Sequence, residues 1–111
     1  MLHDVRKWTV VDHEDDVGDG VEILAVAESP KNLWLWIASA PHSAGPPARI
    51  SCSAVTASGE PLTFRQMQGA GSSEDQFYWV RFNAPPDDVV QLDVTVEVDD
   101  VVRLRKRINP L

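Results

Sequence analysis

Apolar and polar residues alternate along most of this chain with a period of two. The clearest example runs from Val90 to Val98, where valine or leucine fills every second position and Gln, Asp, Thr and Glu fill the positions between. Because side chains of a β-strand point alternately to opposite faces, this segment is predicted to be a half-buried strand. No window of about a dozen residues keeps helical spacing without a Pro, a Gly or a β-branched cluster. The pattern predicts an all-β protein.

Eight strands are predicted, separated by turn-forming sequences such as "DVGDG", "SAGPP" and "NAPPDD". Short strands that recur about every ten residues are typical of an antiparallel sandwich or barrel. The predicted strands are, approximately, Asp4 to Val11, Val21 to Glu28, Leu33 to Ala40, Ala48 to Thr56, Leu62 to Gln68, Gln76 to Asn83, Val89 to Val98 and Val102 to Ile108.

We therefore expect residues 1–111 to form one domain, an antiparallel two-sheet sandwich of about seven to eight strands. The number and spacing of the strands resemble those of immunoglobulin-like and fibronectin-like sandwiches. Tyr78 in a late strand and Trp34 or Trp36 in an early one add to the resemblance, although the paired cysteines of immunoglobulin domains are missing and Val80 stands where the second would be. Such sandwiches host many unrelated functions, so the resemblance predicts no activity.

The last two predicted strands suggest a register. If they form a hairpin, both apolar rows stay on one face only when paired residue numbers sum to 200. With a two-residue turn at Asp99 and Asp100, paired residue numbers would sum to 199, and Arg103 would move into the core. The register with a sum of 200 is therefore predicted. Lys106 falls on the apolar side, where it is expected to reach solvent near an edge. The predicted pairs are Asp93 with Arg107, Val96 with Leu104 and Glu97 with Arg103.

Charge and cysteine content restrict the possible partners and compartments. The net charge is -7 with only ten basic residues, which disfavours binding to nucleic acid or to an anionic membrane surface. The first sixteen residues lack the apolar run of a signal peptide, and no apolar stretch approaches the ~18 residues of a membrane span. Cys52 is the single cysteine, lies in a predicted strand and is expected to be a buried thiol. These features favour a cytoplasmic protein.

Motifs of the common enzyme and cofactor classes are missing, and His3, His13 and His42 have no spacing suited to a metal. We expect no catalytic residues, no cofactor and no metal. The acidic segment from Asp12 to Gly20 fails the EF-hand pattern in both frames that could fit. A calcium site there, helped by Asp87 and Asp88, is the alternative to a solvated turn that guards an edge.

Aromatic residues are the main functional signal. In "NLWLWIA" the two leucines and Ile37 share one face of the predicted strand, and the two tryptophans, Trp34 and Trp36, share the other. In the strand from Gln76 to Asn83, Phe77 and Trp79 share a face with Arg81, which indicates that this face is exposed to solvent. Each aromatic side chain buries ~150–250 Å², and monomers rarely expose apolar patches above ~300–600 Å².

Three explanations are open for these rings. A segment of the same chain could cover them, such as the region around Trp8, the loop from Pro41 to Pro47 or a second sheet. A partner protein or a second copy could cover them, or a carbohydrate could stack on them. We expect a non-catalytic interaction or structural module that binds a protein partner or forms a homo-oligomer, with a ligand-binding module for carbohydrate or calcium as the alternative. The predicted partner-binding residues are Trp34, Trp36, Phe77 and Trp79.

Overall fold

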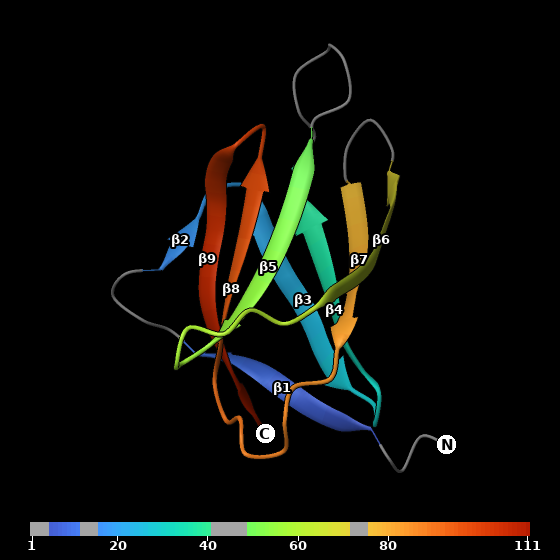
Figure 1. The fold of residues 1–111 in the computed structure, drawn as a ribbon. Helices are drawn as coiled ribbons and strands as arrows, with labels where there is room; N and C mark the ends of the chain where they lie inside the picture. Colours follow the sequence, from blue (N-terminus) through green and yellow to red (C-terminus); the bar gives the residue numbers. More distant parts are fainter. Residues whose placement is uncertain (1–4, 12–15, 41–48, 72–75) are drawn as a thin grey trace.

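The structure, a computed structural model, describes residues 5–11, 16–40, 49–71 and 76–111, which contain nine β-strands and no helix (Figure 1). The strands are β1 (Arg6–Val11), β2 (Val17–Gly18), β3 (Val21–Glu28), β4 (Asn32–Ser39), β5 (Ile50–Thr56), β6 (Phe64–Gly71), β7 (Gln76–Asn83), β8 (Leu92–Val98) and β9 (Val101–Pro110). Eight of them match the predicted strands within three residues, and β2 is an addition inside the acidic segment. In the described part, therefore, no helix has the length and hydropathy needed to cross a membrane.

The strands form a single antiparallel sheet in the order β5-β8-β9-β1-β3-β4-β7-β6, with β2 paired to β9. The sheet nearly closes into a barrel, because β5 meets the segment before β6 through a bridge between Val55 and Pro61 (Figure 1). The Leu62 amide also donates to the Ala54 carbonyl at 2.8 Å. The all-β antiparallel fold is confirmed, whereas a sandwich of two separate sheets is not. The physical reason is that β1 pairs with both β9 and β3 and so joins the two layers in one sheet.

The core follows the predicted alternation. Every second residue of β8 is buried, and the inward rows of β4 and β7 pack beside it. Cys52 is buried as predicted, and burial raises the pKa of its thiol to about 12. The largest fully buried side chains are Phe82, Leu33, Leu35, Leu92, Leu104, Ile108, Val80, Val94 and Val96.

The β8–β9 hairpin confirms the predicted register over most of its length. Paired residue numbers sum to 200 from Leu92, which faces Ile108, to Val96, which faces Leu104. Arg107 and Asp93 are paired as predicted, with Nε 3.3 Å from Oδ1. Burial of the apolar rows therefore sets this register.

Near the turn the predicted register is wrong. A register shift after Val96 makes Glu97 face Val102, and Arg103 pairs instead with Asp19 at 2.6 Å. The turn has two residues, Asp99 and Asp100, both with positive φ (52° and 67°). This two-residue turn and the burial of both apolar rows occur together, because a β-bulge inserts one residue on one strand.

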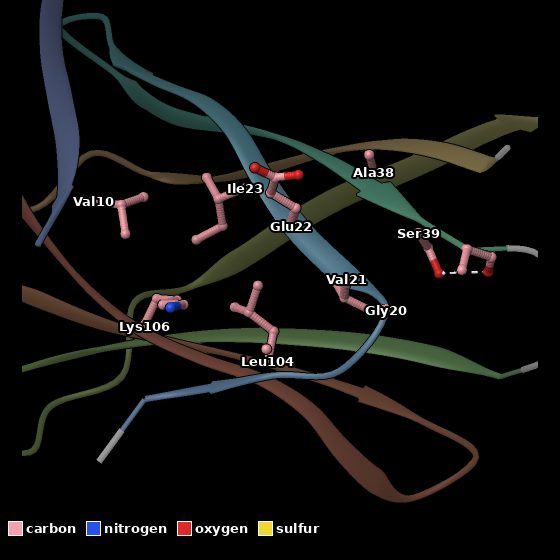
Figure 2. A pocket seen from close by; sticks show the side chains of 11 residues that line it. Val10, Gly20, Val21, Glu22, Ile23, Ala38, Ser39, Leu104 and Lys106 are labelled. Atoms are coloured by element: carbon pink, nitrogen blue, oxygen red, sulfur yellow. Dashed lines mark hydrogen bonds between the residues drawn. The ribbon is translucent and has the colours of Figure 1, made fainter. Parts of the chain in front are cut away.

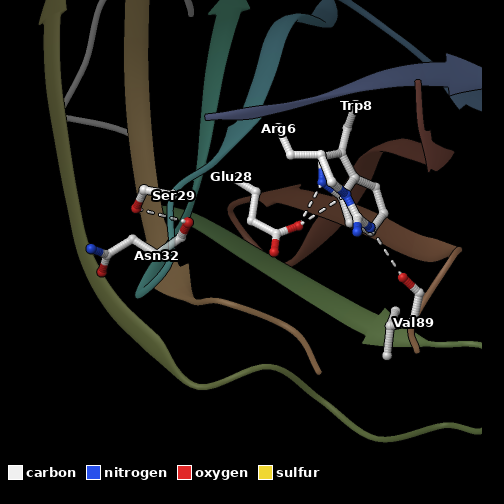
Figure 3. A network of polar contacts seen from close by, with 6 residues as sticks. All are labelled: Arg6, Trp8, Glu28, Ser29, Asn32 and Val89. Atoms are coloured by element: carbon white, nitrogen blue, oxygen red, sulfur yellow. Dashed lines mark hydrogen bonds and ion pairs between the residues drawn. The ribbon is translucent and has the colours of Figure 1, made fainter. Parts of the chain in front are cut away.

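Trp8 lies in the core and does not cover the other tryptophans. It is 4% exposed, and its Nε1 donates a hydrogen bond to Glu28 Oε1 at 2.9 Å (Figure 3). Arg6 Nε lies 3.5 Å from the same carboxylate oxygen, and Arg6 Nη2 donates to the Val89 carbonyl at 3.3 Å. The cluster joins β1 to β3 and to the segment before β8.

Candidate functional site

The four predicted partner-binding residues lie together on the outer face of β4 and β7. Leu33, Leu35 and Ile37 point into the core and are at most 2% exposed, so strand alternation turns Trp34 and Trp36 outward. Val80 and Phe82 are buried in the same way, which turns Trp79 and Phe77 outward. Trp36 pairs directly with Trp79 across the two strands. The tryptophan row, and not the leucine row, thus shares a face with Phe77.

Three of the indoles form a cluster. The ring centroids of Trp34 and Trp36 are 6.5 Å apart with an interplanar angle of 22°, and those of Trp34 and Trp79 are 5.6 Å apart with an angle of 50°. Arg81 places its guanidinium carbon 5.8 Å from the Trp34 centroid and donates from Nη2 to Gln66 at 3.3 Å. Trp34 and Trp79 are consequently half-buried by their neighbours, while Trp36 remains 40% exposed.

The aromatic cluster belongs to a larger surface across β3, β4, β7 and β6, which we name the aromatic wall. On β3, Ala25 pairs with Trp36 and Ala27 with Trp34, and their small side chains leave the indoles uncovered on that side. On β6, Gln66 and Gln68 supply polar amide groups at the margin. We define the aromatic wall by Ala25, Ala27, Trp34, Trp36, Gln66, Gln68, Phe77 and Trp79.

A groove with a volume of about 440 Å³ opens beside the cluster. Trp36, Phe77 and Trp79 line it together with Leu24 and Gln68. Leu24 is 53% exposed because a register shift between Ile23 and Ala25 interrupts the strand alternation. Sequence reasoning missed Leu24, although the unbroken apolar run "ILAVA" was the signal that β3 does not alternate cleanly.

Charge is distributed unevenly over the barrel. The four strands of the aromatic wall contain only two acidic residues in their described part, and one of them, Glu28, is bound to Trp8 in the core. The other, Glu22, is exposed near one end of β3. The outward residues of β8 and β9, in contrast, are mostly charged, and Arg105 is exposed as predicted for a solvent face. The barrel therefore has one charged side and one aromatic, nearly acid-free side.

A larger cavity, of about 630 Å³, lies between β3 and the β2–β9 side of the barrel (Figure 2). It exists because β1 pairs with β3 only through Arg6–Trp8 and then separates from it. Val21 and Leu104 line it, and Lys106 enters it from β9. Lys106 was expected at an edge, but β9 is an inner strand and its Nζ pairs with Asp16 at 3.3 Å. The described lining contains no histidine and no cysteine, and its polar side chains are Glu22, Ser39 and Lys106.

The acidic segment forms ion pairs in its described part. Asp16 binds Lys106 and Asp19 binds Arg103, so these carboxylates already have cationic partners. Residues 12–15 lie outside the described residues, as do His3, His13, His42 and the loop from Pro41 to Pro47. Within the described ranges, no three His, Cys, Asp or Glu side chains are grouped closely enough to hold a metal ion.

Comparison of the chain with protein-family models, with curated proteins and with solved structures finds no match.

Proposed function

We propose that this chain is a non-catalytic interaction module that binds a protein partner through the aromatic wall. The observation that carries the proposal is the exposure of Trp36 (40%) and Phe77 (49%) beside a cluster of two further indoles. Monomeric proteins rarely leave an apolar patch of more than ~300–600 Å² uncovered. At 40% and 49% exposure, Trp36 and Phe77 leave about 130–220 Å² of aromatic surface uncovered. The partly exposed Trp34 and Trp79, together with Leu24, extend the patch to the lower end of that range.

The wall has the composition of a protein-binding surface. Buried aromatic anchors provide most of the affinity at protein interfaces, and a polar rim excludes water and orients the partner. Trp36 and Phe77 are the anchors with the most surface left to bury. Gln68 is exposed beside them and Gln66 holds Arg81, so amide and guanidinium groups form one margin. Docking would bury the rings in the partner without moving the barrel strands.

A carbohydrate platform is less well supported by the ring geometry. Stacking of extended sugars needs accessible rings that lie nearly in one plane, but Trp79 is tilted by 50° to Trp34. The Trp34 ring also packs against Trp36 and Arg81, which occupy part of its surface. Calcium binding is less well supported because Asp16 and Asp19 are paired with cations.

Site-specific photo-crosslinking tests the proposed function. The photoreactive analogue p-benzoylphenylalanine replaces Phe77 in the full-length chain, expressed in the cells from which its gene comes. Arg105, exposed on the charged side, receives the same analogue as the matched control. We expect irradiation to join the chain to protein through position 77 and not through position 105. Absence of any protein adduct at position 77, with the variant folded, would contradict the proposal.

A further inference from the structure

The aromatic wall has both a projecting and a receiving part, as a self-complementary interface requires. In a two-fold symmetric dimer the same patch meets itself, so each copy must present a knob and the space that accepts it. The exposed rings of Trp36 and Phe77 are the knobs. The groove of about 440 Å³ that they border, with Leu24 on its β3 side, is the space next to them.

The charge of the wall favours an uncharged occupant. A basic partner would be held by carboxylates, but among the described residues of the four wall strands only Glu22 presents one to solvent. A strongly acidic partner would need several free cations, but the described wall strands carry two arginines, and one of them, Arg81, packs against Trp34 and donates to Gln66. The other, Arg65, is exposed at the register shift near the start of β6. In a chain of net charge -7, a second copy meets little like-charge repulsion on this acid-poor surface.

The wall is also large enough for a dimer. Each of β3, β4, β6 and β7 has eight residues. With a rise of ~3.3 Å per residue and ~4.8 Å between strands, the whole outer face of these four strands, treated as flat, projects to about 500 Å². Two copies that meet over this whole face would therefore bury up to about 1,000 Å² in total, which is the lower limit for a specific interface.

We propose that the occupant of the aromatic wall is a second copy of this chain, packed face to face about a two-fold axis. This inference rests on the proposed function and names the partner. Trp36 and Phe77 of each copy enter the groove of the other, while the charged strands β8 and β9 remain outside the interface. Salt strengthens the dimer, because it screens the repulsion between two chains that each carry -7 charges.

Sedimentation equilibrium of the full-length chain tests this inference. At about 0.1 mM, where a micromolar dimer is populated, we expect twice the chain mass of 12.3 kDa. Trp36→Glu should raise the dimer Kd at least about tenfold, since it places a charge in the interface centre. Ser53→Glu, an exposed site on β5 with the same change of charge, should leave the Kd unchanged. Phe77→Glu is the second interface variant, and circular dichroism shows whether each variant is folded.

The outcomes separate this inference from the proposed function. Three results would overturn the second copy as occupant. The wild-type chain could stay monomeric, or the dimer could survive in folded Trp36→Glu or Phe77→Glu. The third result is a dimer whose Kd rises when salt increases from about 0.05 M to about 0.5 M. If position 77 then crosslinks to a different protein, the proposed function stands with another partner. If position 77 crosslinks to no protein, both are contradicted.

Discussion

The four tryptophans have two different roles, and strand alternation decides which one each has. Trp8 is 4% exposed and donates to the Glu28 carboxylate, so its indole serves the core. Trp36 is 40% exposed on the outer face of β4, and its position follows from the burial of Leu35 beside it. A residue type that is on average highly buried therefore occupies both the core and the outer face of the same chain.

Trp8→Phe should lower the free energy of unfolding by about 1.5–3 kcal/mol. The change removes the N–H that donates to Glu28 at 2.9 Å, and a buried hydrogen bond to a charged group contributes about that much. Urea denaturation measures the effect, with Trp36→Phe as the matched control. For Trp36→Phe we expect a change within about 0.5 kcal/mol, as for a surface substitution. Equal losses of unfolding free energy in the two variants would show that the hydrogen bond from Trp8 to Glu28 does not stabilise the fold.

At the scale of the strands, the sequence predicted existence and register well and irregularities poorly. Alternation identified eight strands because one face of each packs into a common core. It could not predict the bulge next to Glu97, because that bulge depends on the tight turn and on Asp19, which draws Arg103 away from β8. The register shift that exposes Leu24 depends likewise on pairing with β4, which lies later in the chain.

Asp100→Gly should stabilise the β8–β9 hairpin by up to about 1 kcal/mol. Asp100 has φ 67°, a conformation that is strained for residues with a Cβ and free for glycine. Asp99→Ala should have the opposite effect, because Asp99 Oδ1 accepts a hydrogen bond from the Arg49 amide at 2.9 Å. Thermal unfolding of the two variants measures both changes. A lower melting temperature for Asp100→Gly would contradict the turn geometry.

At the scale of the whole molecule, sequence alternation could not separate a sandwich from a barrel. Both architectures bury one face of every strand, so both give the same apolar pattern. The decision lies in the pairing of β1 with β9 and β3, which are far apart in the sequence. The aromatic residues were predicted as one surface, and the structure brings all four together on adjacent strands. The proposed partner that covers them is a second molecule, and a single sequence carries no information on it.

The barrel is thus two-sided, with charge pairs over β8 and β9 and aromatic rings over β4 and β7. This division explains why an acidic chain can carry a broad apolar surface. A net charge of -7 opposes unspecific association of the charged side, while the nearly acid-free side offers little repulsion to a partner. The central claim is that the outer rings are there for binding and contribute little to folding.

Urea unfolding of Trp36→Ser and Leu35→Ala tests this claim most directly, at a concentration where sedimentation shows only monomer. The two residues are adjacent on β4 and point to opposite faces. We expect Leu35→Ala to lower the free energy of unfolding by about 2–5 kcal/mol, as for a fully buried leucine. Trp36→Ser should lower it by less than about 1 kcal/mol. A loss from Trp36→Ser as large as that from Leu35→Ala would mean that the wall belongs to the core.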